Sequence, residues 1–450
     1  MICCPILISL IRRRQPISLT AVVDSPDALR HDFPMQQAKP WSNGLILLLF
    51  IGVTALAAPP KRIAAIVTEY RHNSHADVIV SRLILTNTLD GKGKSPNLKL
   101  VSLYTDQVPK SDTSRKWSKQ FNVPIYNTVE ESLTLGTDKL QVDGVLLIAE
   151  HGVYPKNATG NTIYPKRRLF NEVQKVFRKT GQSVPVFVDK HLADNWKDSK
   201  WLYDTAAELK VPLMAGSSLP VLWRYPPVDV ERDAKLKEIV AVSYHTLDAY
   251  GFHALEMVQC LVERRDGGET GVKQVRTLTG EAVWQAMENK VFDRELLYDA
   301  LKRLKGSAVT KRLDTPLREQ VKEPVLFTID YRDGLRANVL TLNYTVAEWA
   351  VAWRRADGGK RSTTFWTQEA RPYMHFTYLV NGTEQMFHTG KPAWPAERTL
   401  MTSALLDALL ISKSKNNAVV PTPFLNFKYT TDWNWKQPPP PPPGRPLNQQ

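Results

Sequence analysis

The strongest constraint on the fold is a regular alternation of apolar strands and amphipathic helices between residues 61 and 215. The intervening polar segments have helical spacing, most clearly at 76–85, 111–121, 167–179 and 196–209. Short apolar or β-branched runs predict strands at 62–68, 98–104, 123–126, 144–149, 184–188 and 211–215. Strands that alternate with helices in this way predict a parallel, doubly wound α/β sheet with right-handed crossovers.

After residue 216 the rhythm changes. One long helix is expected at 251–264, and alternating segments at 325–331, 337–344 and 376–380 predict a largely antiparallel open sheet with one covered face. A last helix is expected at 396–411. We therefore expect two domains, 61–215 and 216–432. A tail at 433–450, which contains six consecutive prolines, is expected to be extended and disordered.

The segment before residue 58 predicts export. An apolar run within 43–60 ends in Ala55-Leu56-Ala57, a small-x-small pattern, and Lys39 precedes it. These features indicate a signal peptide cleaved near Ala57, with translation starting at Met35. The alternative is an uncleaved anchor. Because the run is shorter than the roughly 20 residues of a membrane helix, we expect a periplasmic or extracellular protein without a stable span in its mature form.

The charge and cysteine content exclude some classes of function. The formal charge is +14, but basic and acidic residues are interspersed, and no block of like charges is present. This pattern indicates a generic basic surface and not a nucleic-acid tract. After removal of the leader only Cys260 remains. It lies in an apolar helical pattern, so we interpret it as a buried structural cysteine without a disulfide.

The first strand and helix form a βαβ opening with an altered turn. The three positions of the pattern G-x-G-x-x-G fall here on Val67, Glu69 and His72. The second glycine normally lets the backbone approach a pyrophosphate, whereas Glu69 presents a carboxylate at that point. The sequence therefore predicts that this fold is kept while its usual nucleotide site is changed.

Histidines and acids follow the strands of the predicted parallel sheet. The loops after parallel strands all open at the carboxyl edge of the sheet, where ligands bind. Six of the nine histidines lie in these predicted loops and therefore map to one rim. Imidazoles and carboxylates in one cleft can hold a divalent metal or transfer protons, and the metal candidates are His72, His75, His151 and His191. Since no spacing matches a known metal signature, a pocket for a polyhydroxylated ligand is the alternative, with aromatic rings from Tyr70, Tyr154, Trp223 and Tyr225.

Several segments then resemble, in order, the motifs of the glucose–fructose oxidoreductase, inositol dehydrogenase and MocA (Gfo/Idh/MocA) family. These segments are FNVPIYNTVEESL at 121–133, VDGVLLIAEHGVY at 142–154, VPVFVDKHLADNW at 184–196 and DAYGFHALE at 248–256. The third stands where the family has a strand that ends in Glu-Lys-Pro, and here the triplet is Asp189-Lys190-His191. The resemblance covers residues 61–429 and implies a Rossmann-type domain followed by a substrate domain.

The resemblance implies a set of site residues. Lys190 and His253 correspond to the pair that positions a sugar hydroxyl and removes its proton while NAD(P) takes the hydride, with Asp248 or Glu256 orienting the histidine. The cofactor positions correspond to Asp106, which would hold a ribose, and to Glu69, His72 and Glu150. Substrate contacts are expected at Trp223, Arg224, His151 and Tyr154. A homo-oligomer formed through the open sheet is also implied.

Three functions remain open at this point. The first is an exported oxidoreductase-type protein that acts on a carbohydrate with atypical or lost NAD(P) binding. The second is a non-redox hydrolase or lyase, with or without a divalent metal, that uses the same cleft. The third is a non-catalytic sugar-binding or scaffold protein. All three expect a small carbohydrate ligand and no nucleic acid.

Overall fold

The computed structural model describes residues 58–442. The predicted leader and its cleavage point near Ala57 lie outside these residues, as does the end of the chain from 443 to 450. Within the described part, no helix has both the length and the apolar character needed to cross a membrane.

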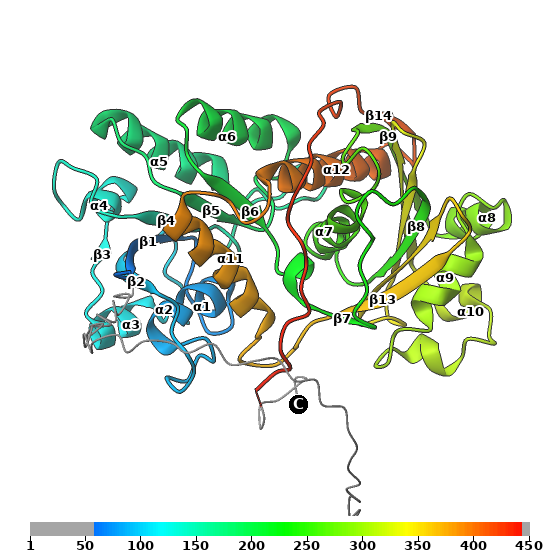
Figure 1. Cartoon of the computed structure of the whole chain (residues 1–450), viewed down its shortest axis with the longest axis horizontal. Coiled ribbons are helices and arrows are strands. Elements are labelled where there is room, and N and C mark those ends of the chain that lie inside the picture. Colours follow the sequence, from blue (N-terminus) through cyan, green and yellow to red (C-terminus); the bar gives the residue numbers. More distant parts are fainter. Residues whose placement is uncertain (1–57, 443–450) are drawn as a thin grey trace, which may run out of the picture. The chain divides into compact units, whose positions relative to one another are not determined.

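The first half of the described chain forms a six-stranded sheet in the order β3-β2-β1-β4-β5-β6, with every pair parallel (Figure 1). This confirms the predicted doubly wound α/β sheet. The elements are β1 (Lys61–Val67), α1 (His75–Val80), α2 (Arg82–Leu85), β2 (Leu98–Thr105), α3 (Ser114–Phe121), β3 (Ile125–Tyr126), α4 (Val129–Thr134), β4 (Gly144–Ile148), α5 (Lys166–Thr180), β5 (Val186–Asp189), α6 (Trp196–Glu208) and β6 (Leu213–Gly216).

The second half forms an eight-stranded sheet in the order β14-β9-β10-β11-β8-β12-β13-β7, in which only β11 and β8 pair in parallel. Its elements are η1 (Leu219–Val221), β7 (Trp223–Tyr225), β8 (Leu236–Ser243), α7 (Tyr250–Val262), β9 (Val272–Thr279), α8 (Glu281–Glu288), α9 (Arg294–Leu301), η2 (Ala308–Lys311), α10 (Leu317–Gln320), β10 (Pro324–Tyr331), β11 (Arg336–Leu342), β12 (Trp349–Arg355), β13 (Lys360–Trp366), α11 (His375–Thr389), α12 (Ala396–Ser414) and β14 (Val420–Pro421).

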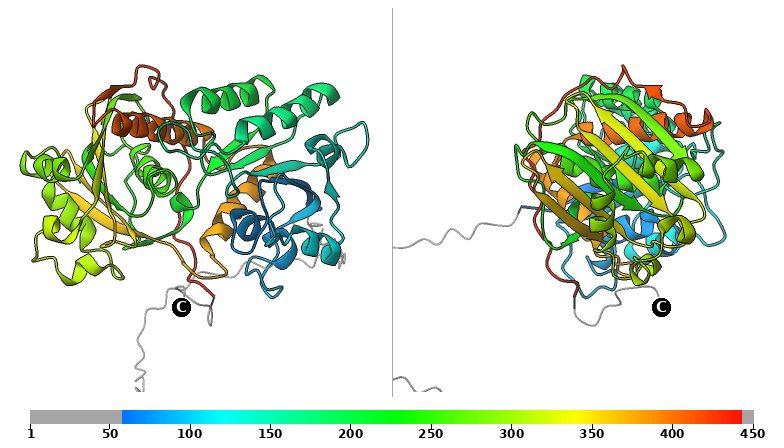
Figure 2. Two further views of the ribbon diagram at one scale, coloured as in Figure 1. Left: turned by 180° about the vertical axis from the view of Figure 1, so that it is seen from behind. Right: turned by 90° about the vertical axis from the view of Figure 1, so that its right-hand side faces the viewer.

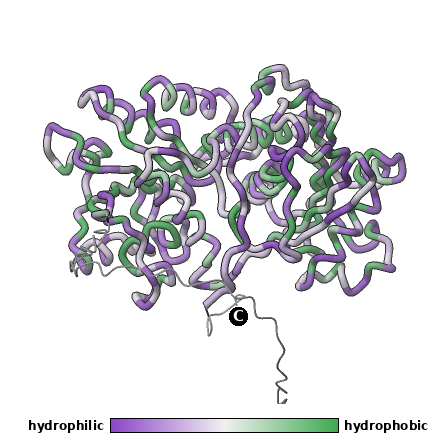
Figure 3. The backbone as a smooth tube through the Cα atoms, in the orientation of Figure 1, coloured by the Kyte–Doolittle hydropathy of each residue, from purple (hydrophilic) through white to green (hydrophobic). Residues whose placement is uncertain are grey.

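Helices cover both faces of each sheet (Figures 1 and 2). On the parallel sheet, α4, α5 and α6 pack against one face, whereas α1 and α11 pack against the other. On the second sheet, α7 and α12 cover one face, and α8, α9 and α10 cover the face that was expected to be open. In Figure 3 hydrophobic residues run along the strands, and the outer helices alternate between hydrophilic and hydrophobic residues. A homo-oligomer through this sheet stays a prediction.

Helices α11 and α12 depart from the expected organisation. The segment 376–380 was expected as a strand but lies inside α11. Leu379, Val380, Thr383, Met386 and Phe387 are buried with helical spacing, so packing against the parallel sheet overrides the β-branched and aromatic composition. Helix α12 contacts α6 and β6 as well as α7 and β9. Both helices therefore belong structurally to the first sheet too, although they follow residue 215.

The C-terminal segment is ordered over its described part, unlike the expected disordered tail. The Trp435 indole donates to the carbonyl of Leu222, and the backbone N–H of Arg224 donates to the Gln437 side chain. Both Trp223 and Tyr378 donate to the carbonyl of Pro439. Residues 435–439 therefore lie against β7 and α11. Proline has no backbone N–H to donate, but its carbonyl still accepts hydrogen bonds from aromatic donors.

Candidate functional site

A buried lysine lies at the carboxyl edge of the parallel sheet. Lys190 directly follows β5, has φ of 56°, and is 8% exposed. Its backbone N–H donates to the carbonyl of Gly216 at 3.1 Å. This isolated bridge ties Lys190 to the last residue of β6, beside the end of the parallel pairing of β5 with β6. The left-handed conformation at Lys190 is uncommon for a residue with a side chain, and such strain occurs preferentially at functional sites.

Glu150, just after β4, neutralises this lysine. One carboxylate oxygen lies 3.1 Å from the Lys190 Nζ, and the other accepts from the Lys166 Nζ at 2.5 Å. Lys166 also donates to the carbonyls of Asp189 and His191. Burial raises the pKa of Glu150, but the two ammonium groups outweigh this effect and hold that pKa well below its usual range. Burial lowers the pKa of Lys190, but Glu150 and Asp189 outweigh it and raise that pKa.

A histidine–aspartate pair lies beside the same edge. The Nδ1 of His75 and the Oδ2 of Asp189 are 2.6 Å apart, and Asp189 is fully buried while the His75 side chain is 14% exposed. The backbone N–H of His75 donates to the Nδ1 of His151 at 3.3 Å. Burial, and then the positive charge of His75, lower the pKa of His151 to about 2. His151 is therefore neutral at ordinary pH, and Asp189 fixes the orientation of the His75 ring.

His253 lies in the first turn of α7 and is partly exposed. Its ring packs 6.1 Å from Tyr250 and 5.9 Å from Trp349, measured between ring centroids. Burial, followed by the charge of Lys190, lowers the pKa of His253 well below its usual range. Its Nδ1 has no hydrogen-bond partner within residues 58–442. The charge of Lys190 thus acts on the imidazole of His253, and the joint role of the two residues stays a prediction.

The two acids expected to orient His253 lie elsewhere. Asp248 faces the Lys156 ammonium at 3.5 Å and accepts from the Thr162 hydroxyl. Glu256 accepts from the Ser217 backbone N–H at 3.1 Å and from the hydroxyls of Thr399 and Thr402. Neither acid bonds to the imidazole in this structure, which therefore does not bring the predicted orienting acids and His253 together. The reason is the helical register of α7, which turns Glu256 toward β6 and α12.

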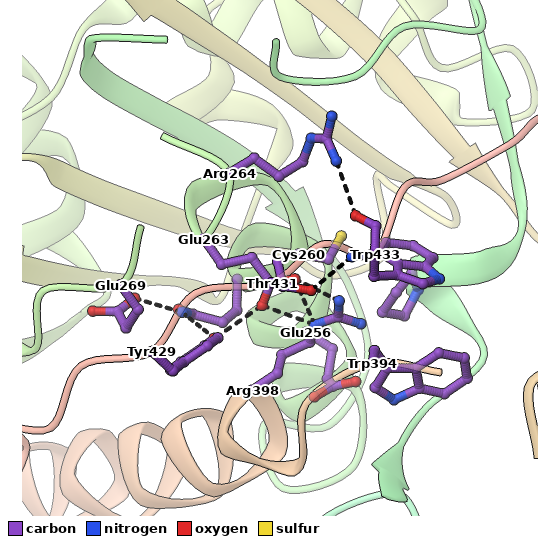
Figure 4. Close-up of polar contacts among 12 residues, drawn as sticks. Glu256, Cys260, Glu263, Arg264, Glu269, Trp394, Arg398, Tyr429, Thr431 and Trp433 are labelled. Carbon is purple, nitrogen blue, oxygen red and sulfur yellow. Dashed lines mark hydrogen bonds and ion pairs between the residues drawn. The ribbon is translucent and has the colours of Figure 1, made fainter. Parts of the chain in front are cut away.

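Figure 4 shows the surroundings of Glu256. The nearby Glu263 and Arg398 form a fully buried ion pair, and the Tyr429 hydroxyl donates to Glu263. Burial raises the pKa of Glu256 to about 7, with Arg398 opposing the shift. This network joins α7, α12 and the C-terminal segment. Its role is therefore structural.

The altered turn is filled by the chain's own charges. Glu69 is buried and pairs with Arg71 at 2.6 Å. At the start of α1, Ser74 caps the helix, and the buried Asp77 accepts from the Asn73 backbone N–H at 2.9 Å and from Arg371 at 2.6 Å. His72 is exposed, 3.8 Å from Asp77.

A dinucleotide needs free N–H donors at this helix start and room for its two phosphates. The residues present supply two carboxylates instead. Asp106, which the resemblance assigns to a ribose, already accepts from the hydroxyls of Tyr104 and Tyr154 and from Arg168. The altered turn therefore presents arginine-paired carboxylates where the G-x-G-x-x-G pattern has backbone donors.

The remaining predicted residues divide into two groups. His151 belongs to the cluster around Lys190, and Tyr154 lies on Asp106. Trp223 and Arg224 are fully buried, and Arg224 lies between Phe365 and Trp435 while it pairs with Asp229 at 2.7 Å. Both side chains are thus closed off from solvent in this structure, and their predicted role as substrate contacts stays a prediction. The packing of the C-terminal segment over β7, which no local signal in the sequence shows, is the cause of this burial.

The described histidines are not gathered into one cluster with acidic side chains. No group of three or more histidine, cysteine or acidic side chains in the described chain could hold a metal ion. His191 lies 3.7 Å from the Glu150 carboxylate, and burial lowers its pKa to about 3. The four metal candidates have different surroundings. His72 is at the surface, His75 contacts Asp189 and His151, and His191 contacts Glu150.

Sequence reasoning missed one residue of the cluster and one contact within it. Lys166 lies at the start of α5, and no motif marks it as functional. The pairing of His75 with Asp189 joins positions 114 residues apart, and only the adjacency of β1, β4 and β5 could indicate it. A cavity of about 670 Å³ adjoins the predicted rim. It is lined by Asp248, His245, Lys156 and Tyr244, among others, but not by Lys190 or His253.

Comparison with known proteins supports the fold. No protein-family model matches the chain, and no curated protein matches its sequence. Among solved structures, GenD2 from gentamicin A biosynthesis in complex with NAD matches with a TM-score of 0.52 and 12% identity, over 81% of this chain and 97% of GenD2. A protein described as a probable dehydrogenase from Thermotoga maritima matches with a TM-score of 0.50 and 13% identity, over 81% of this chain and 99% of that protein. The chain therefore has the fold of Gfo/Idh/MocA-type dehydrogenases, which confirms the fold expected from the motifs.

Proposed function

We propose that the protein acts on a carbohydrate or a similar polyhydroxylated compound by proton transfer at Lys190 and His253, without NAD(P) bound in the altered turn. The observation that carries this proposal is the Lys190–Glu150 pair near a neutral, partly exposed His253. This combination offers a hydrogen-bond donor of fixed charge and a base in one place.

The ammonium of Lys190 keeps its proton at neutral pH because Glu150 and Asp189 raise its pKa. It can donate a hydrogen bond to a hydroxyl or carbonyl oxygen on which negative charge develops. The ring of the partly exposed His253 can accept a proton from carbon or oxygen, while its Nδ1 is buried without a hydrogen-bond partner in the described chain. His75, oriented by Asp189, supplies a second imidazole whose position is fixed. Such a set supports isomerisation or elimination in a sugar derivative, reactions that need no external oxidant.

Dehydrogenation remains the second candidate. It is favoured by one observation: GenD2, which has the same fold, was solved in complex with NAD. The carboxylates of Glu69 and Asp77 in the turn weigh against it, since they place negative charge where a diphosphate needs donors. Export in an unfolded state, which the leader predicts, also separates the chain from cytosolic cofactor.

Deuterium exchange tests the proposal. The full chain is incubated in D₂O with a panel of aldoses, ketoses and uronic acids, and incorporation at carbon is followed by NMR. We expect exchange on at least one sugar class, lost in both Lys190→Met and His253→Ala. Glu172→Gln, which alters a surface carboxylate, is the control with unchanged exchange. Binding of a sugar without exchange in the unaltered protein would favour a non-catalytic binding role.

A further inference from the structure

A second cavity, of about 630 Å³, opens where β13 pairs with β7 at the edge of the second sheet. The lining side chains that matter are Tyr225, Arg303, Lys305, Glu348, Trp366 and Glu369. No residue of the Lys190 cluster lines it. Its volume is within the usual range of small-molecule sites, about 300–1,000 Å³.

The cavity combines aromatic faces with charged groups. The Tyr225 ring is 41% exposed and lies 6.2 Å from the Trp366 ring at an interplanar angle of 63°. Carboxylates and cationic groups line the same space. A purely apolar ligand would leave these charges unpaired, and a strongly anionic ligand would meet two carboxylates. A sugar matches both parts, because its C–H face packs on aromatic rings and its hydroxyls bond to charged groups.

Two of the charged groups are free to bind a ligand. Glu348 is already used, since it accepts from the backbone N–H groups of Lys305 and Gly306 and from the Ser307 hydroxyl. In contrast, the Glu369 carboxylate and the Lys305 ammonium have no hydrogen bond or ion pair with any other side chain in the described chain. Glu369 is partly exposed, so a donor group of a ligand can reach its carboxylate.

The C-terminal segment supplies another wall. Pro441 lines the cavity, and the carbonyl of Pro439 accepts from the Trp223 indole at 2.8 Å and from the Tyr378 hydroxyl at 3.2 Å. These bonds hold the segment against strand β7 and helix α11, whose positions Figure 1 shows. The shape of the cavity therefore depends on the hydrogen-bonded segment that contains Pro439 and Pro441.

The charge of Glu369 also acts on an aromatic residue beside His253. Burial, and then the Glu369 carboxylate, raise the pKa of Tyr250. The Tyr250 ring stacks on Trp349 at 5.5 Å and lies 6.1 Å from the His253 ring.

We infer that this cavity is a second carbohydrate subsite, in which Tyr225 and Trp366 pack against a sugar ring while Glu369 and Lys305 bind its hydroxyls, so that the protein prefers oligosaccharides to single sugars. This inference rests on the proposed function, since it names the class of substrate for that function.

The test measures binding of cellotetraose, maltotetraose and chitotetraose, each against its monosaccharide, by calorimetry on the full chain. We expect at least one tetrasaccharide to bind at least about tenfold more tightly than its monosaccharide. Tyr225→Ala and Glu369→Gln should each weaken tetrasaccharide binding by about tenfold or more and leave monosaccharide binding and the melting temperature unchanged. Glu319→Gln, an exposed carboxylate outside the cavity, is the matched control.

The outcomes separate the two proposals. Lys190→Met should keep the tetrasaccharide preference but lose deuterium exchange. If exchange is never found and the preference still depends on Tyr225 and Glu369, the proposed chemistry fails and the subsite stands. The subsite is overturned if no tetrasaccharide binds at about 10 mM, or if both cavity variants bind as tightly as the unaltered protein.

Discussion

Replacing Glu150 by glutamine tests the charge pairing on which the candidate site depends. Glu150 is 1% exposed and is the carboxylate partner of both Lys190 and Lys166. Glutamine keeps the size and one acceptor oxygen but removes the charge. The two buried ammonium groups then lose their common counter-ion, while Lys166 retains two backbone carbonyls.

Removing one partner of a buried ion pair typically costs about 3–5 kcal/mol, because the other charge stays buried and unpaired. Lys166 is fully buried and cannot reach solvent, whereas the Lys190 side chain is 10% exposed and can partly relax. We therefore expect Glu150→Gln to lower the free energy of unfolding by about 3–4 kcal/mol. Guanidinium unfolding followed by tryptophan fluorescence measures this loss.

A double-mutant cycle isolates the pair. Lys190→Met alone, and Lys190→Met with Glu150→Gln, complete the cycle, and residues in direct contact should show a coupling energy of about 1–3 kcal/mol. The surface variant Glu172→Gln should stay within about 0.5 kcal/mol of the unaltered protein. A loss below about 1 kcal/mol for Glu150→Gln, with no coupling to Lys190, would refute the pairing and with it the argument for a charged Lys190.

The pH dependence has a definite sign. The folded-state pKa of Glu150 is depressed, so its contribution to stability is present above the pKa of a free glutamate, about 4.3, and is lost as the pH falls through the folded value. The stability of the unaltered protein should therefore fall in acid, and Glu150→Gln should reduce this acid dependence.

Other residues give further expectations. Because burial raises the pKa of Glu256 to about 7, its contribution to stability is full below about pH 4.3 and is lost as the pH rises through 7; Glu256→Gln should flatten thermal stability measured between pH 5 and 8, and an unchanged slope would contradict the burial argument. Truncation after Asn434 removes the Trp435 stack on Arg224 and the indole bond to Leu222, so it should cost about 2–4 kcal/mol in denaturant unfolding, and no loss would mean that the segment is not docked. Asp189→Asn should release the His75 ring from its fixed orientation, since it removes the anionic partner 2.6 Å away; unchanged imidazole chemical shifts of His75 in NMR spectra would exclude that pair.

Much of the fold could be predicted because local pattern and tertiary structure agree. The strands of the parallel sheet are continuous apolar runs, buried on both faces, and their alternation with helices leaves few topologies. The segment 376–380 was mispredicted because its short apolar run suits either a strand or a helix. Only its packing on the parallel sheet decides between them.

The positions of candidate site residues could be predicted where a sequence motif fixes them. Their side-chain contacts could not, because tertiary packing decides them. Lys190 and His253 follow from their places at the end of β5 and the start of α7, since topology fixes these points. The roles expected for Asp248, Glu256 and Arg224 depend on side-chain direction. Spacing along the chain does not determine this direction, and the docked C-terminal segment, which buries Arg224, lies more than 200 residues away in sequence.

Calorimetric titration of the full chain with NAD, NADH, NADP and NADPH measures whether the altered turn binds a dinucleotide. We expect no binding at about 1 mM of any of the four, because Glu69 and Asp77 place buried carboxylates where a diphosphate would need donors. One-to-one binding with a Kd in the range of about 1–100 μM would contradict this expectation and would favour dehydrogenation, the second candidate.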